Sequence, residues 1–162
     1  MSRQATYDDV NLVLRLYELR RDDKLRAARD WFSKEFKAKT FDEARELMPP
    51  GSLHNEYFRM VTSYWDMAAS LVTQGAIPAE MFNEANTEHI ALFAKLRPFL
   101  AEVRSATGYP DYLGNIERVI EMLPEPEERL ALFGRYMARQ RALAAEGKQR
   151  SALAESPGQA HA

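Results

Sequence analysis

The stretch that decides the fold runs from residue 52 to residue 103 and reads SLHNEYFRMVTSYWDMAASLVTQGAIPAEMFNEANTEHIALFAKLRPFLAEV. Its first half is apolar around most of a helical circumference, and Gly75 then suits the left-handed position that closes a helix. Pro78 is typical of the first turn of the next helix, which carries a second apolar stripe. Because a helix this apolar packs on more than one neighbour, the pattern predicts an all-α bundle.

The central helix is predicted to begin after Ser52 and to hold the middle of the core. Its expected core residues are Tyr57, Val61, Tyr64, Trp65, Ala68 and Leu71. The polar residues left over form a narrow edge made of Arg59, Thr62, Ser63, Asp66, Ser70 and Thr73. The next helix is predicted to start at Pro78 and to carry His89 on its stripe, until Pro98 kinks it or starts a segment that ends at Gly108.

Capping patterns mark the helices on either side. Thr6 and Asp9 have the spacing of a capping box, which predicts a helix over residues 8–20. Its apolar pattern comprises Val10, Val13, Leu14 and Tyr17. A second helix is expected from Asp22, with one long kinked helix as the alternative. Thr40 starts a short third helix.

Further along the chain, Asp111 is expected to cap a helix over residues 112–123, and a last helix follows Pro126. No apolar periodicity remains beyond Leu153, and the composition from Glu146 onward is typical of a variable tail. We therefore expect one bundle domain at residues 6–146, with about six to eight helices. A flexible C-terminal tail is predicted at residues 147–162.

Composition limits the classes of function. The chain has 162 residues and no cysteine, which excludes disulfides, thiolate nucleophiles and sulfur-based zinc sites. Residues 1–9 lack the apolar core of a secretory signal, and no stretch reaches the roughly 20 apolar residues of a membrane span. We expect a cytoplasmic protein without a membrane span.

Charge is banded along the chain. Residues 20–39 hold eight basic and four acidic side chains, whereas residues 40–128 hold six basic and fifteen acidic ones. With Trp31 and Phe32 nearby, the first band allows a nucleic-acid surface made of Arg20, Arg21, Lys24, Arg26 and Arg29. A pI near 6.0 favours instead a solvated face, or a face that meets the acidic section of another subunit.

His89 is the ionisable residue on an apolar stripe, and it is either a ligand or acid–base group or a core histidine with one hydrogen bond. With Tyr64 and Trp65 it defines a candidate inter-helix pocket for a small ligand. Asn86 stands where a di-iron bundle needs a glutamate, so no metal centre is expected. No nucleophile elbow, phosphate-binding loop or dinucleotide fingerprint is present, so we expect no catalytic residue and no cofactor.

The segment Tyr64–Gly75, followed by Ile77–Phe82, resembles a group of bacterial all-helical domains of unknown function. In this group an aromatic-rich helix ends in glycine, and the next helix leads to an arginine-containing segment, here residues 97–104. Leu25–Arg29 is similar to the basic helix that precedes them. The resemblance covers residues 10–104 and implies a fold type and bacterial origin. Some members carry a membrane anchor ahead of the domain, which this sequence lacks.

These observations lead to three hypotheses. The first is a helical protein that acts without catalysis through protein contacts, as a homodimer. The second is a small-ligand-binding or enzymatic protein with its pocket near Trp65 and His89. The third is nucleic-acid binding through the basic segment that begins at Arg20.

Overall fold

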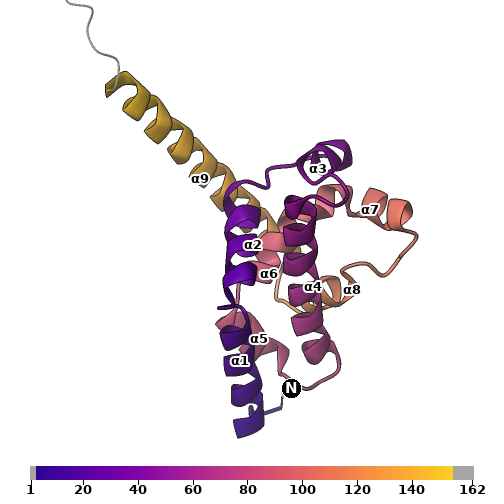
Figure 1. Ribbon diagram of the computed structural model, residues 1–162. Coiled ribbons are helices and arrows are strands. Elements are labelled where there is room, and N and C mark those ends of the chain that lie inside the picture. The colour runs from indigo at the N-terminus through magenta and orange to yellow at the C-terminus, as the bar shows by residue number, and fades with distance from the viewer. Residues whose placement is uncertain (1–2, 155–162) are drawn as a thin grey trace, which may run out of the picture.

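The computed structural model describes residues 3–154 of the chain (Figure 1). Its elements are α1 (Tyr7–Leu19), α2 (Asp23–Lys34), α3 (Phe41–Leu47), α4 (Leu53–Thr73), α5 (Ala79–Ala85), α6 (Glu88–Leu96), a 3-10 turn (Arg97–Phe99), α7 (Leu100–Thr107), α8 (Gly114–Glu121) and α9 (Pro126–Ala154). The described residues form no strand. The predicted all-α class is confirmed.

Helix α4 runs through the middle of the fold. It packs against both α2 and α8, while α6 packs against α8 and α9 (Figure 1). Of its six predicted core residues, Val61, Tyr64, Trp65 and Ala68 are buried and the other two are half-buried. The prediction that this helix packs on more than one neighbour is confirmed.

The predicted helix starts agree with the capping geometry. The side chains of Thr6, Thr40 and Ser52 each accept a hydrogen bond from the backbone N–H three residues later, at 3.1–3.3 Å. Asp22 caps α2 in the same way, because its carboxylate accepts from two backbone N–H groups at 3.1 Å. Two separate helices therefore precede α3, rather than one kinked helix. Gly75 has a φ of 78°, the left-handed conformation predicted for it.

The helix expected from Pro78 onward is interrupted, which corrects the prediction of a single element. Asn86 has extended backbone, with φ −141° and ψ 133°, and α6 begins after Thr87. The Asn86 side chain donates to the carbonyl of Phe82 at 3.2 Å. Asparagine competes for backbone hydrogen bonds in this way, and the break separates Phe82 on α5 from His89 on α6.

Helix α9 projects away from the body of the molecule (Figure 1). Leu130 is buried and Phe133 packs half-buried against the core, so the first turns attach the helix. The proposed boundary between residues 146 and 147 falls inside α9, which is helical to Ala154. Residues 155–162 of the predicted tail lie outside the described residues.

Within residues 3–154, none of the helices has both the length and the apolar character that a membrane crossing requires.

Candidate interaction site

The outward side of α1 carries a line of large apolar side chains. Tyr7 is 80% exposed, Val10 40%, Leu14 55% and Tyr17 51%. These positions share one side of a helix because their spacing follows the 3.6-residue period. Single exposed apolar residues are ordinary, whereas a continuous patch is typical of an interaction surface. We call these four residues the α1 outer face.

The opposite side of α1 contacts the body of the molecule through a few residues. Leu16 is buried, and its carbonyl accepts a hydrogen bond from the Tyr64 hydroxyl at 2.5 Å. Arg3 binds both carboxylate oxygens of Asp9, at 2.5 and 2.6 Å, and also donates to the carbonyl of Gly75 at 3.3 Å. This arginine and the capping N–H of Thr6 hold the pKa of Asp9 well below its usual range. Leu16 and Asp9 therefore link the inner side of α1 to the body, and the α1 outer face lies on the other side of the helix.

The three residues of the predicted ligand pocket lie together in the core. The ring centroids of Trp65 and His89 are 5.8 Å apart, and Tyr64 meets Trp65 edge-on at 5.1 Å. Trp65 and His89 are completely buried and Tyr64 almost so. The ring of Phe82 lies 4.9 Å from that of His89 and meets Trp65 edge-on at 6.4 Å. The three side chains predicted to line a pocket are therefore neighbours, and they lie in the core.

His89 is held in its neutral form. Its Nε2 pairs with Asn83 Oδ1 at 2.9 Å, while Nδ1 is buried without a hydrogen-bond partner among the described residues. Burial lowers the pKa of His89 to about 4, although the neighbouring Glu88 carboxylate acts in the opposite direction. A neutral, packed imidazole with one amide partner matches the core-histidine interpretation.

Glu88 is the residue that sequence reasoning missed. It binds Arg29 of α2 through contacts of 2.6–3.1 Å and accepts from Trp65 Nε1 at 3.2 Å. Its place beside His89 was visible in the sequence, but the partner arginine lies 59 positions away. This half-buried ion pair links α2 to the start of α6, next to Trp65.

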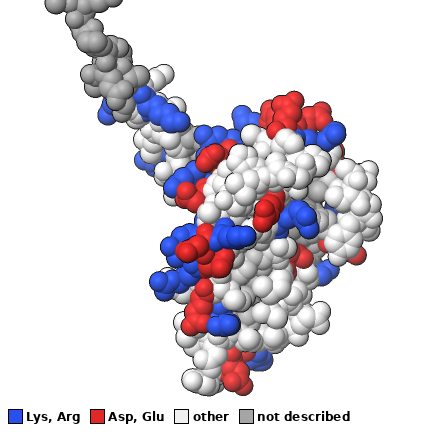
Figure 2. Space-filling view, viewed as in Figure 1, with Lys and Arg blue, Asp and Glu red and all other residues white. Residues whose placement is uncertain are grey.

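The five basic residues proposed for nucleic acid do not form one free surface. Arg29 pairs with Glu88, and the guanidinium of Arg20 lies 5.7 Å from the Trp65 ring. Arg26 donates to the carbonyl of Arg21 at 2.9 Å. Lys24 and Arg21 are exposed. Basic and acidic side chains alternate on the face that Figure 2 shows, so the charge there is mixed.

A groove of about 570 Å³ runs between α2 and α6. Phe32, Val61 and Leu92 contribute apolar surface to it, and the Arg29–Glu88 pair stands at its wall. Lys95, at the far end of α6, donates to the carbonyl of Phe32 at 2.6 Å and so caps the end of α2. The groove is therefore apolar in its middle, and the charged groups at its two ends already have partners within the chain.

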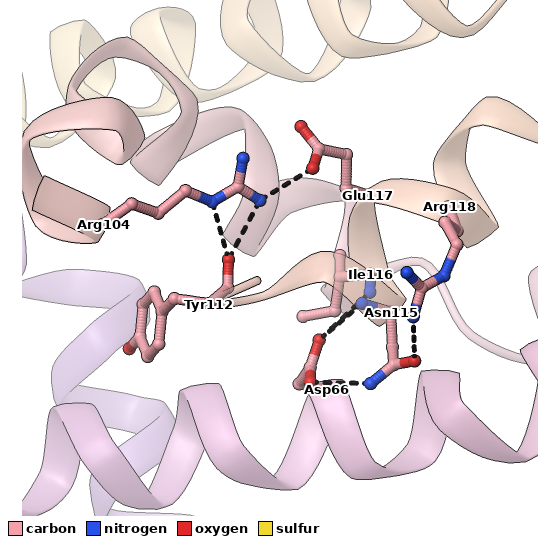
Figure 3. Close-up of polar contacts among 7 residues, drawn as sticks. All are labelled: Asp66, Arg104, Tyr112, Asn115, Ile116, Glu117 and Arg118. Carbon is pink, nitrogen blue, oxygen red and sulfur yellow. Dashed lines mark hydrogen bonds and ion pairs between the residues drawn. The ribbon is translucent and has the colours of Figure 1, made fainter. Parts of the chain in front are cut away.

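The polar edge of α4 has a structural role. Asp66 Oδ1 accepts from the backbone N–H groups of Asn115 and Ile116 at 3.1 and 3.2 Å, and Oδ2 accepts from the Asn115 side chain at 2.9 Å (Figure 3). Asp66 therefore caps α8 from across the fold. The predicted cap, Asp111, does not fill this position, because α8 begins only at Gly114, after Leu113 in a left-handed conformation with φ 58°.

The loop before α8 is fixed by Arg104. Its guanidinium donates twice to the carbonyl of Tyr112, at 3.0 and 3.1 Å, and pairs with Glu117 at 2.7 Å (Figure 3). The Tyr112 hydroxyl donates to Thr62 on α4 at 3.1 Å, and burial raises the pKa of this phenol. A second groove of about 420 Å³ lies between this loop and α4.

These polar groups act as helix caps and as links between helices. Asp66, Glu88 and Glu117 are each occupied by backbone N–H groups or by a cation. Among the described residues, no three histidine, aspartate or glutamate side chains gather as a metal site. The geometry defines a helical domain whose distinctive surface is the α1 outer face.

A family described as a domain of unknown function, DUF4760, matches residues 5–123, and the chain belongs to this family. This confirms the resemblance to helical domains of unknown function. The match includes α1 and ends just before α9. No curated protein and no solved structure matched the chain.

Proposed function

We propose that this chain is a protein-interaction domain that forms a homodimer through the α1 outer face. One observation carries the proposal: four large apolar side chains stand exposed in line on a helix whose other side is already attached to the core. Covering such a face removes apolar area from water, which is the main driving force of most protein association.

The test compares two leucines with similar exposure. Leu14 on α1 is 55% exposed and Leu143 on α9 is 50% exposed. Leu14→Glu places a charge in the proposed contact, so its sedimentation coefficient should stay at the monomer value over a concentration series. Leu143→Glu should follow the unmodified chain, whose average mass should rise with concentration. A monomeric unmodified chain at every concentration would refute the proposal.

A second candidate function is small-ligand binding in the groove between α2 and α6. The observation that favours it is the Trp65–Glu88 hydrogen bond, because Glu88 lines that groove and Trp65 lies directly behind it. A ligand that displaces Arg29 from Glu88 would change the surroundings of the indole. Thermal shift and tryptophan fluorescence with a metabolite panel test this function, and Glu88→Gln is the matched variant that should abolish any response.

A further inference from the structure

The α1 outer face has nearly the same pattern when it is read in either direction. Its residues are separated by three, four and three positions, and their order is tyrosine, valine, leucine, tyrosine. A tyrosine stands at each end, and a branched aliphatic residue flanks the centre on each side, near Leu12. A face with this symmetry is complementary to itself after a half-turn, which is the relation used by two-fold dimer contacts.

We infer that two copies pair through α1 in antiparallel orientation. Tyr7 of one copy lies against Tyr17 of the other, and Val10 lies against Leu14. The inference rests on the proposed function and adds the geometry of the contact. It makes each aromatic residue face an aromatic residue, an arrangement that stabilises a contact beyond the area it buries.

The size of the face fits a weak dimer of two copies. From their exposed fractions, the four side chains offer about 500 Å² per chain, so that a pair buries at most about 1,000 Å² in total through this face. This is the lower limit for a specific interface. A dimer with an interface of this size should dissociate readily on dilution.

Electrostatics favours the antiparallel arrangement over the parallel one. Each α1 has a partly positive N-terminus and a partly negative C-terminus, and antiparallel packing places opposite ends together. Glu18, on one edge of the face, already pairs with Arg15 of its own helix at 3.0 Å. In the antiparallel pair the two Glu18 side chains are about 18 Å apart along the helix axis, so they do not repel each other strongly.

Cross-linking of single-cysteine variants tests the orientation, because the chain has no cysteine of its own. Tyr7→Cys and Tyr17→Cys are treated separately and as a mixture with a short bis-maleimide that joins facing side chains only. The mixture should give a covalent dimer. Tyr7→Cys alone should not, since two Tyr7 positions are about 15 Å apart along the axis.

A further variant keeps all four apolar residues. The two Asn11 positions lie on the same edge of the antiparallel pair, about 3 Å apart along the axis, so Asn11→Cys should link to itself. Leu132→Cys on α9, at a position that is also exposed, should stay unlinked. Efficient linking of Tyr7→Cys to itself would show parallel pairing and overturn the inference.

A concentration-dependent dimer that none of the α1 cysteines links would place the contact on another face. That result overturns the inference but leaves self-association intact. If sedimentation shows the unmodified chain to be monomeric throughout, the proposed function fails as well.

Discussion

Helices α4 and α1 are both apolar on two sides, yet the fold covers α4 on both sides and α1 on one. α4 lies between α2 and α8, and Trp65 at its middle is completely buried. α1 lies at the margin, where Leu16 faces the core and Tyr17 faces water. The difference teaches that apolar periodicity predicts how many partners a helix needs, whereas position in the fold decides whether the chain itself supplies them.

The largest loss of stability should come from removing a large buried side chain from α4. Trp65→Ala removes a buried indole and its hydrogen bond to Glu88, so the free energy of unfolding should fall by about 3–5 kcal/mol. Tyr17→Ala on α1 should change it by no more than about 0.5 kcal/mol at low concentration, where the chain is monomeric. Urea unfolding followed by circular dichroism measures both. If both variants lose the same free energy of unfolding, the proposed difference between α4 and α1 is wrong.

His89 on α6 is buried in the same core, and its burial should make the folded chain less stable at acidic pH. Its pKa is about 4 in the folded chain, against 6.5 when it is unperturbed. Between these pH values the unfolded chain binds a proton that the folded chain does not. The free energy of unfolding should therefore fall by about 3 kcal/mol as the pH drops from 6.5 to 4.

The control for this pH dependence is the other described histidine, His54, which is exposed and stacks on Trp31 at 4.8 Å. His54→Gln should retain the slope, and His89→Gln should lose it. If His89→Gln does not fold, an NMR titration of the His89 ring in the unmodified chain gives the same information. A ring that titrates near pH 6.5 would contradict the buried position.

A smaller effect should distinguish the two aspartates near the start of α8. Asp66→Ala leaves two backbone N–H groups without their acceptor, which should cost about 1–2 kcal/mol. Asp111→Ala removes an exposed carboxylate and should cost no more than about 0.5 kcal/mol. Thermal unfolding of the two variants side by side provides the measurement. A larger loss of stability in Asp111→Ala than in Asp66→Ala would indicate that Asp111 caps α8, as the sequence predicted.

Local signals predicted most of the helices, because caps and glycine closures act within a few residues. Thr6, Ser52 and Gly75 all stand where the sequence placed them. The failures involve partners that are distant in the chain. Asp66, and not Asp111, caps α8, and it lies 49 positions before Asn115 in the chain. No local sequence pattern predicts such a contact.

The candidate site was harder to predict for a related reason. Two apolar stripes interleave along α1, one through Leu16 and one through Leu14, and both have helical spacing. Periodicity alone cannot say which stripe meets the core, since that depends on how α1 lies against Tyr64. Likewise the sequence identified Trp65 and His89 as neighbours but missed Glu88, whose role depends on Arg29 of another helix.

Helix α9 gives the molecule a built-in spacer. Beyond Met137, the last of its residues to line the groove at the body, the helix continues to Gln149, and residues 138–140 and 142–149 are exposed. At the rise of an α-helix, Gln149 stands about 18 Å further along the axis than Met137. A fluorophore at Gln149 is thus held clear of both grooves and of α1, where it can report distances without disturbing what it measures.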